Sequence, residues 1–283
     1  MQPKMLYMRE NLDTRTVEGF GDEWKRFDQS ALSEAELNEL FDRYFSLFPW
    51  EMLPESAVGF DMGCGSGRWA RRVAPKVARL YCMDASYQAL GVAKRMLSGN
   101  ESCEFVHASV GGLPIRDGCM DFGYSLGVLH HVPDTAAAIK ECADKLKPGA
   151  PFLIYIYYAF DNRPLWFRLV WRLSDVFRKI ISSLPMGPRY YAAQLIALCV
   201  YFPLARFALL LERLGLNVDA IPLSSYRRAS FYTMRTDALD RFGTRLEKRF
   251  TADQIEAMMR DAGLERIAFA PSLPYWCAVG IKN

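Results

Sequence analysis

One glycine-rich segment of the 283-residue chain has the composition and spacing of a ligand-binding loop. Gly63, Gly65 and Gly67 follow a short apolar run and precede a segment with helical spacing. Glycine tolerates positive φ and lets a ligand approach the backbone, while a helix N-terminus offers amide donors to an anionic group. A dinucleotide-binding loop has the spacing G-x-G-x-x-G, but Arg68 occupies that third glycine position here. The loop alone therefore indicates either a ligand site or a tight turn without a ligand.

A second candidate residue lies about 20 positions further on, where a ribose-binding acid is found in nucleotide-binding folds. Asp84 ends the next apolar run, and its carboxylate can accept two hydrogen bonds from a ribose diol. The alternative is that Asp84 caps the helix that follows. The loop and the acid stand on consecutive strand ends, and together they favour a nucleoside-bearing cofactor at the carboxyl edge of a sheet.

Alternating short strands and helices must position these residues. This alternation predicts a doubly wound α/β fold with parallel strands and right-handed crossovers. The expected strands are 57–62, 80–83, 103–107, 122–126, 151–158, 264–269 and 276–281. A helix is expected from the glycine loop to about Val77, and another opens with the capping pattern Ser33 to Glu36.

Composition limits the class of protein. Hydrophobic residues make up 51% of the chain and the net charge is +3, so we expect a soluble globular protein that does not bind nucleic acid. The seven cysteines include no C-x-x-C pair, which argues for a reducing, cytoplasmic compartment and against a metal site. Residues 1–13 lack an apolar run, so no secretory signal is expected.

Several further motifs stand in register with the loop and the acid. The matching segments are DMGCGSG from Asp61, MDAS from Met83, LPI from Leu113, MDF from Met120, GVLHHVPD from Gly127 and LKPG from Leu146. This array resembles class I S-adenosylmethionine-dependent methyltransferases, in the branch that contains ubiquinone and menaquinone C-methyltransferases. The resemblance covers roughly residues 57–158. It implies a seven-stranded sheet of order 3-2-1-4-5-7-6 whose last strand is antiparallel, with S-adenosylmethionine as cofactor and S-adenosylhomocysteine as product.

The resemblance also implies a set of cofactor contacts. It places Asp84 at the ribose and Leu126 near the sulfonium. The other implied contacts are Asp61, Gly63, Gly65 and Gly67 toward the methionine end, with Ala85 beside Asp84. Ser109 and Val110 stand where the family often has Asp-Ala at the adenine, and a serine binds the exocyclic amine more weakly.

An aromatic segment near the N-terminus looks like the cap of some relatives. Trp24 in this segment would close over the cofactor. The alternative is that Trp24 and Phe27, three residues apart on a helix, pack in the core.

A methyl acceptor that is a hydroxyl or an acidic carbon needs a general base. The chain has three histidines, and two of them, His130 and His131, follow the fourth strand, where the resemblance places the substrate mouth. We take this pair as the catalytic candidates. The alternative is that the pair caps or packs a helix.

A helical insertion is expected over residues 159–235, between an N-terminal helical cap (1–50) and the two parts of the cofactor-binding domain (51–158 and 236–283). Residues 160–235 hold eleven basic and four acidic side chains. The uncharged run 190–205 is shorter than the roughly 20 residues of a membrane span, so a buried or interfacial helix is expected. The insertion is interpreted as a lid that also makes salt-sensitive contact with anionic membrane through Arg168, Arg172 and Arg178. Alternatively its arginines face water.

These observations predict methyl transfer from S-adenosylmethionine to a small-molecule, amphiphilic or lipid-like acceptor, in the cytoplasm or at its membrane. The candidate substrate contacts are Tyr158, Tyr226, Tyr232 and Arg235. The alternatives are a nicotinamide-dependent oxidoreductase and a non-catalytic relative that binds the cofactor. The sequence predicts neither the acceptor atom nor the oligomeric state.

Overall fold

The computed structural model describes residues 11–283, which form two compact units. The sheet unit comprises residues 11–29, 37–159 and 246–283, and the helical unit comprises residues 30–36 and 160–245. Residues 1–10 lie outside the described residues. They include most of the stretch in which no secretory signal is expected, and part of the expected cap 1–50.

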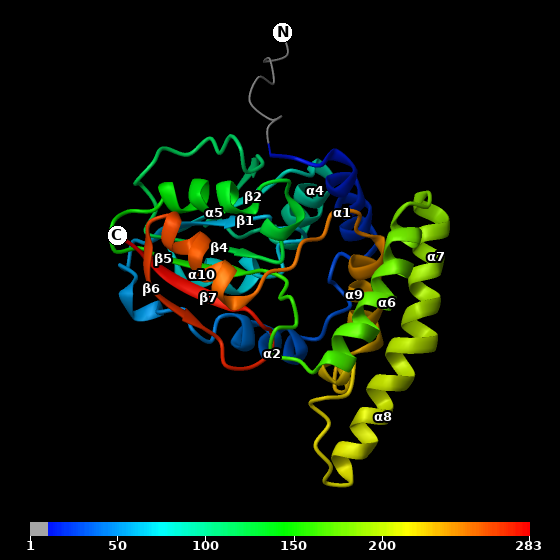
Figure 1. The fold of residues 1–283 in the computed structure, drawn as a ribbon. Coiled ribbons are helices and arrows are strands. Elements are labelled where there is room, and N and C mark those ends of the chain that lie inside the picture. The colour runs from blue at the N-terminus through cyan, green and yellow to red at the C-terminus, as the bar shows by residue number, and fades with distance from the viewer. Residues whose placement is uncertain (1–10) are drawn as a thin grey trace. The chain divides into compact units, whose positions relative to one another are not determined.

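The sheet unit is built on one seven-stranded sheet (Figure 1). Its strands are β1 (Val58–Met62), β2 (Arg79–Asp84), β3 (Cys103–His107), β4 (Phe122–Leu126), β5 (Pro151–Tyr155), β6 (Leu264–Phe269) and β7 (Cys277–Lys282). The order is β3-β2-β1-β4-β5-β7-β6, and β7 runs antiparallel to both of its neighbours. This confirms the expected fold and strand order.

Two reciprocal glycine–phenylalanine pairs hold the central strands together. Gly59 on β1 pairs with Phe122 on β4, and Phe60 on β1 pairs with Gly123 on β4. A Cβ atom on Gly59 would lie 2.3 Å from the Phe122 ring, and one on Gly123 would lie 2.3 Å from the Phe60 ring. Each glycine therefore makes room for the aromatic ring of the neighbouring strand.

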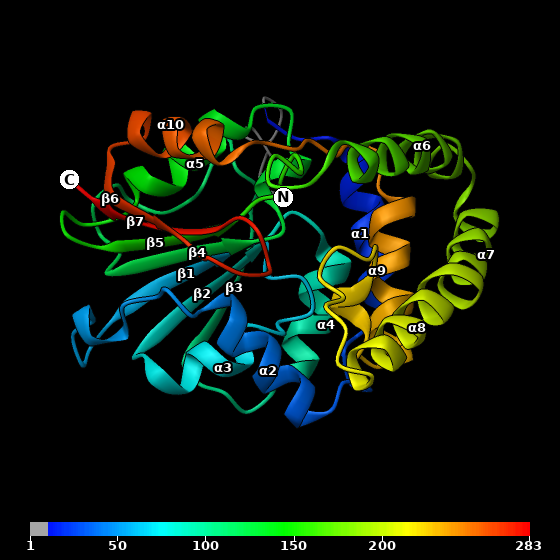
Figure 2. The same cartoon turned by 60° about the horizontal axis from the view of Figure 1, so that its bottom comes forward.

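Helices cover both faces of this sheet (Figure 2). The helices of the sheet unit are α1 (Thr14–Arg26), α2 (Glu34–Tyr44, shared with the helical unit), α3 (Ala70–Val73), α4 (Tyr87–Met96), α5 (Thr135–Asp144) and α10 (Ala252–Asp261). On one face α5 and α10 bury Ile139 and Ile255, and on the other α2 and α4 bury Phe41 and Leu90. The expected helix from the glycine loop to Val77 is shorter, because Pro75 lacks an amide donor and α3 gives way to a 3-10 turn.

The helical unit consists of long helices packed around a small core. They are α6 (Leu165–Ser182), α7 (Met186–Ile196), α8 (Phe202–Arg213) and α9 (Phe231–Gly243). A π-helical segment, Ala197–Tyr201, joins α7 to α8 just before Pro203, where a regular helix would lose a hydrogen bond. The result is one continuous rod, Met186–Arg213, whose 28 residues are about 42 Å long at 1.5 Å per residue.

The length of this rod corrects the expectation that its apolar segment is too short to cross a membrane. It is the one helix in residues 11–283 that is long and apolar enough to do so by length and composition, with a mean hydropathy of 1.9 over an 18-residue window. A core helix of a soluble protein can meet the same test, but only 22% of the apolar window is buried here.

The helical unit extends beyond the expected insertion at its C-terminal end and includes a separate segment from the N-terminal part of the chain. It continues to Arg245 rather than residue 235, because Met234, Ala238 and Phe242 of α9 pack against Ala197 of the rod. It also includes residues 30–36. Ser33 caps α2 as expected, but the Glu36 side chain accepts hydrogen bonds from residues 230 and 233 instead of completing a capping box.

Candidate functional site

A pocket of about 850 Å³, part of it open to solvent, lies at the carboxyl ends of the parallel strands in the sheet unit. Met62 and Gly63 follow β1, Asp84 and Ala85 follow β2, and Leu126 ends β4 at the pocket wall. Ligands of doubly wound sheets bind at this edge.

The glycine loop has the backbone conformation that its sequence predicts. Gly63, Gly65 and Gly67 have φ of +79°, +55° and +80°. A Cβ on Gly63 would lie 2.3 Å from Val128, and one on Gly65 would lie 2.8 Å from Trp24, so both glycines permit close packing around the pocket. Gly67 instead faces the helix behind it. Of the three glycines, Gly63 lines the pocket, and Gly65 and Gly67 do not.

Asp84, the last residue of β2, is hydrogen-bonded to the glycine loop. Its carboxylate accepts hydrogen bonds from the amide of Gly65 at 2.9 Å and of Ser86 at 2.8 Å, and burial raises its pKa. The Ser86 hydroxyl caps α4, accepting from Ala89, so Asp84 is not the helix cap. Each carboxylate oxygen retains a second acceptor position, which suits a ribose diol.

Asp61 lies one residue behind the pocket wall at the end of β1. It is 1% exposed, and burial raises its pKa, while the neighbouring Tyr124 hydroxyl opposes that rise. Its Oδ2 atom makes no hydrogen bond of regular geometry within the described residues. An unsatisfied buried carboxylate oxygen is costly and fits a site that receives a donor group. At the other side, Ser109 and Val110 line the pocket as expected of an adenine contact.

Helix α1 forms a further wall of the pocket. Thr16, Phe20 and Trp24, spaced four residues apart, lie on one face of α1 and line the pocket, while Phe27 is buried. This arrangement favours the cap interpretation of Trp24 over core packing. Thr16 and Phe20 were not among the predicted site residues, although their four-residue spacing from Trp24 on a helix indicates that they share its face.

The pocket wall contains several other residues that the sequence analysis did not select. They are Leu12, Asp13, Val17, Met62, Cys64, Ser66, Arg68, Trp69, Gly127, Val128 and Val132. Six of them belong to the two motifs that begin at Asp61 and Gly127, and the other five stand in no motif.

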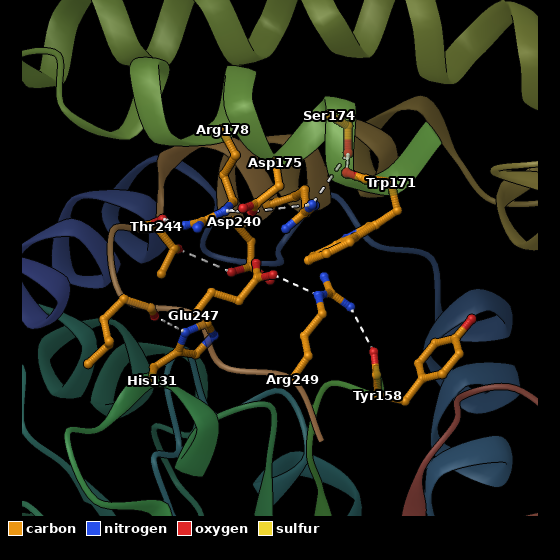
Figure 3. A network of polar contacts seen from close by, with 12 residues as sticks. His131, Tyr158, Trp171, Ser174, Asp175, Arg178, Asp240, Thr244, Glu247 and Arg249 are labelled. Atoms are coloured by element: carbon orange, nitrogen blue, oxygen red, sulfur yellow. Dashed lines mark hydrogen bonds and ion pairs between the residues drawn. The ribbon is translucent and has the colours of Figure 1, made fainter. Parts of the chain in front are cut away.

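The two adjacent histidines have different surroundings. His131 lines the pocket, and its Nδ1 lies 2.7 Å from the carbonyl oxygen of Leu246 (Figure 3). His130 is fully buried, stacks on Tyr157 with ring centroids 3.9 Å apart, and is absent from the pocket wall. Burial holds the pKa of His130 well below its ordinary value. Of the two catalytic candidates, only His131 lines the pocket.

None of the four candidate substrate residues lies in the pocket wall. In the sheet unit, the carbonyl oxygen of Tyr158 accepts a hydrogen bond from Arg249 (Figure 3). In the helical unit, Arg235 donates to Gln194 and Tyr190. Tyr226 packs against Tyr201 in that unit, with the ring planes tilted by 56°, and Tyr232 lies on α9.

The comparisons with known proteins agree with this geometry. Residues 60–154 match the family described as "Methyltransferase domain". The ubiquinone biosynthesis O-methyltransferase of Aromatoleum aromaticum is 29% identical over 133 residues, which cover 46% of this chain and 54% of that protein. The demethylmenaquinone methyltransferase of Bacillus licheniformis is 27% identical over 132 residues, covering 44% and 55%. The chain thus spans about half the length of the curated relatives it matches.

Solved structures share the fold. A chain of the complex between the Haloferax volcanii Trm112 methyltransferase activator and a methyltransferase gives a TM-score of 0.51 at 15% identity, covering 92% of this chain and 97% of that chain. Human N-acetylserotonin methyltransferase in complex with S-adenosylmethionine gives 0.51 at 14% identity, covering 93% and 56%. At such identities the likeness shows the architecture alone.

Proposed function

Because residues 60–154 form a class I S-adenosylmethionine-dependent methyltransferase domain, we propose that the chain transfers a methyl group to a small amphiphilic acceptor. One observation carries this proposal. A single pocket brings together the glycine loop, the ribose-type acid Asp84, the Ser109–Val110 pair and Leu126, which come from four different strand ends.

The residues present fit the cofactor. Asp84 would hold the ribose hydroxyls, Ser109 the adenine edge, and the buried Oδ2 of Asp61 would receive a donor from the methionine end. S-adenosylmethionine supplies, when bound, an electrophilic methyl group on a sulfonium.

Methyl transfer needs alignment and exclusion of water more than a reactive side chain. The α1 wall and Trp24 serve this purpose. His131 is the residue that can take a proton from the acceptor. With Nδ1–H donating to Leu246, its Nε2 is the basic nitrogen of the neutral ring.

The proposed acceptor class rests on the pocket wall and on two relatives. The wall includes Leu12, Val17, Phe20 and Val128, an apolar lining suited to an amphiphile. The relatives are named for ubiquinone biosynthesis and for demethylmenaquinone. The seven cysteines are all free, which supports a reducing, cytoplasmic setting for the reaction.

Calorimetric titrations test the proposal against its rivals. We expect S-adenosylhomocysteine to bind and nicotinamide dinucleotide not to bind. Binding of the dinucleotide alone would favour an oxidoreductase. If S-adenosylhomocysteine binds but no methyl group is transferred from S-adenosylmethionine to any quinol or phenol acceptor tested, a non-catalytic relative is favoured.

A further inference from the structure

Exposed large apolar side chains gather in one part of the helical unit. Within residues 11–283, nineteen such side chains are exposed, and seventeen of them lie between Leu165 and Leu216. The other two are Met52 and Tyr87. Scattered exposed apolar residues are ordinary on soluble proteins, but a concentration of this kind marks an interaction surface.

Helix α6 has its polar face inside the unit and its apolar face outside. Arg178 and Ser182 are each 5% exposed, whereas Leu169, Leu173 and Phe177 are 60%, 59% and 62% exposed. Figure 3 shows Ser174, Asp175 and Arg178 pointing from α6 into the polar network of the helical unit. The apolar residues recur three and four positions apart and so share one face. This polarity is the reverse of that in a surface helix of a soluble protein.

The rod Met186–Arg213 is apolar on both sides. Ala193, Ala197, Ala205 and Ala208 are fully buried, and Figures 1 and 2 show the rod alongside α9. Its outward residues are also apolar: Leu195, Leu198, Phe207 and Leu210 are 52–61% exposed. A helix that is hydrophobic all round belongs in an apolar environment on every side.

Arginines of the helical unit donate hydrogen bonds to other residues of the same unit. Arg168 donates to the carbonyl oxygens of Phe160 and Asp161, and Arg178 donates to Asp175 and to the carbonyl oxygen of Thr244. Of the three arginines expected to face anionic lipid, only Arg172 is exposed. Electrostatic attraction through the trio is therefore not the main source of binding energy that this surface offers.

The charges that remain exposed on α6 and the rod all have one sign. They are Arg172, Lys179 and Arg213. The acids Asp175 and Glu212 are only partly exposed and form ion pairs with neighbouring basic residues. This pattern complements anionic lipid headgroups, while two copies of the face would bring like charges together.

We infer that α6 and the rod form a lipid-docking surface that lies in the plane of a phospholipid membrane, with its outward apolar residues in the boundary between headgroups and acyl chains. The surface contains no residue of the cofactor pocket, so this inference goes beyond the proposed methyl transfer. A spanning rod would draw α9 into hydrocarbon, together with Arg235, Asp240 and Arg241, and that is costly.

Co-sedimentation with vesicles tests the inference. The full chain is mixed with vesicles of phosphatidylcholine alone, and of phosphatidylcholine with phosphatidylserine, at about 0.1 M and about 1 M salt, between which the screening length falls from about 10 Å to about 3 Å. Docking by apolar insertion predicts binding to both vesicle types that persists at the higher salt, somewhat tighter to the anionic ones.

A triple variant, Leu169→Gln, Leu173→Gln and Phe177→Gln, removes apolar area from the outward face of α6. We expect its partition coefficient to fall at least about tenfold, equivalent to about 1.4 kcal/mol. Met52→Gln is the matched control, an exposed apolar residue outside the surface, and it should bind vesicles as the original chain does. Unchanged affinity for S-adenosylhomocysteine in the triple variant shows that the sheet unit is folded, and it separates this test from that of the proposed function.

Three outcomes would overturn the inference. In the first, the original chain does not sediment with either vesicle type at low salt. In the second, it binds only anionic vesicles, is released at high salt, and the triple variant binds equally well, which would return the contact to electrostatics. In the third, sedimentation velocity shows a dimer that the triple variant abolishes and no vesicle binding occurs, which would make a second copy the partner.

Discussion

Asp84 is an acceptor for the glycine loop as well as the residue proposed to hold the ribose, and its replacement removes both contacts. We expect Asp84→Ala to weaken binding of S-adenosylhomocysteine by about 1–3 kcal/mol, the usual range for hydrogen bonds to a charged group. Calorimetry measures the change. Asp84→Asn retains one acceptor for Gly65, so its affinity should lie between those of Asp84→Ala and the original chain.

The exposed carboxylate Asp42 on α2 provides the control for this series. Asp42→Ala should leave the affinity unchanged. Equal affinities across all four proteins would remove Asp84 from the cofactor site.

The two histidines predict opposite results for neighbouring substitutions. His131→Ala should lower kcat roughly 10²–10⁴-fold, the usual contribution of a general base, with cofactor affinity intact. His130→Phe retains a ring against Tyr157 and should keep most of the turnover. Near-original turnover in His131→Ala would return His131 to a structural role.

Burial of His130 has a consequence for stability at acid pH. Because burial lowers its pKa well below the ordinary 6.5, the unfolded chain takes up a proton on this residue before the folded chain does. The stabilisation is therefore complete above pH 6.5 and is lost as the pH falls toward the folded pKa, at up to about 1.4 kcal/mol per pH unit.

Denaturant unfolding of the original chain and of His130→Phe, between pH 7 and pH 5, checks this expectation. The difference between the two free energies of unfolding should shrink or reverse as the pH falls. The raised pKa of Asp61 acts in the opposite sense in both proteins and cancels in the difference. A difference that does not change with pH contradicts the expectation.

Among single residues, those that belong to a motif could be predicted from the sequence. Those whose role depends only on where the side chain points could not. Gly63, Asp84 and Ser109 stand in recognisable positions and line the pocket. His130 and His131 cannot be distinguished by type or by spacing, because a tight turn sends adjacent side chains to different surroundings.

At the scale of elements, the glycine loop needs positions without a Cβ atom for two reasons: the positive φ and the close approach of neighbouring side chains. Gly63→Ala would place a Cβ 2.3 Å from Val128 at a φ of +79°. Gly99 has a φ of +86° and no atom within 4 Å of its Cβ position, so Gly99→Ala carries only the conformational cost, of about 1–2 kcal/mol. We expect Gly63→Ala to lose clearly more unfolding free energy, by about 1–3 kcal/mol from overpacking, and to lose cofactor binding.

Equal destabilisation of the two alanine variants would show that Val128 moves aside at no cost. The double variant Gly63→Ala, Val128→Ala should recover part of the loss, because it removes the atoms that the new Cβ meets.

The elements themselves were predictable where hydrophobic period and turn residues agree, as in β3 and β4, whose bounds match the expected ranges. The strand order came from the family resemblance, because pairing is not visible in a local pattern. The rod was underestimated because Arg189 and Arg206 look like helix-ending charges. Instead they donate to main-chain carbonyl oxygens within the helical unit, and the helix continues past both.

At the scale of the whole molecule, ligand binding should raise the free energy of unfolding. S-adenosylhomocysteine at 100 times its dissociation constant should add about 2.7 kcal/mol to the free energy of unfolding of the sheet unit. Thermal unfolding followed by calorimetry, with and without ligand, measures this gain. The Asp84→Ala variant at the same ligand concentration should gain less, and an equal gain in both proteins would mean that binding does not use Asp84.

The N-terminal wall of the pocket is anchored by residues that do not line the pocket themselves. Two hydrogen bonds fasten the entrance to α1: the Asn11 side chain donates to the carbonyl oxygen of Asp134 at 2.7 Å and accepts from its amide at 2.6 Å. Neither bond touches the pocket, yet α1 supplies Phe20 and Trp24 to its wall. The start of α1 is thus tied to the segment that precedes α5, so the helix that supplies this wall is anchored by contacts made just outside the pocket lining.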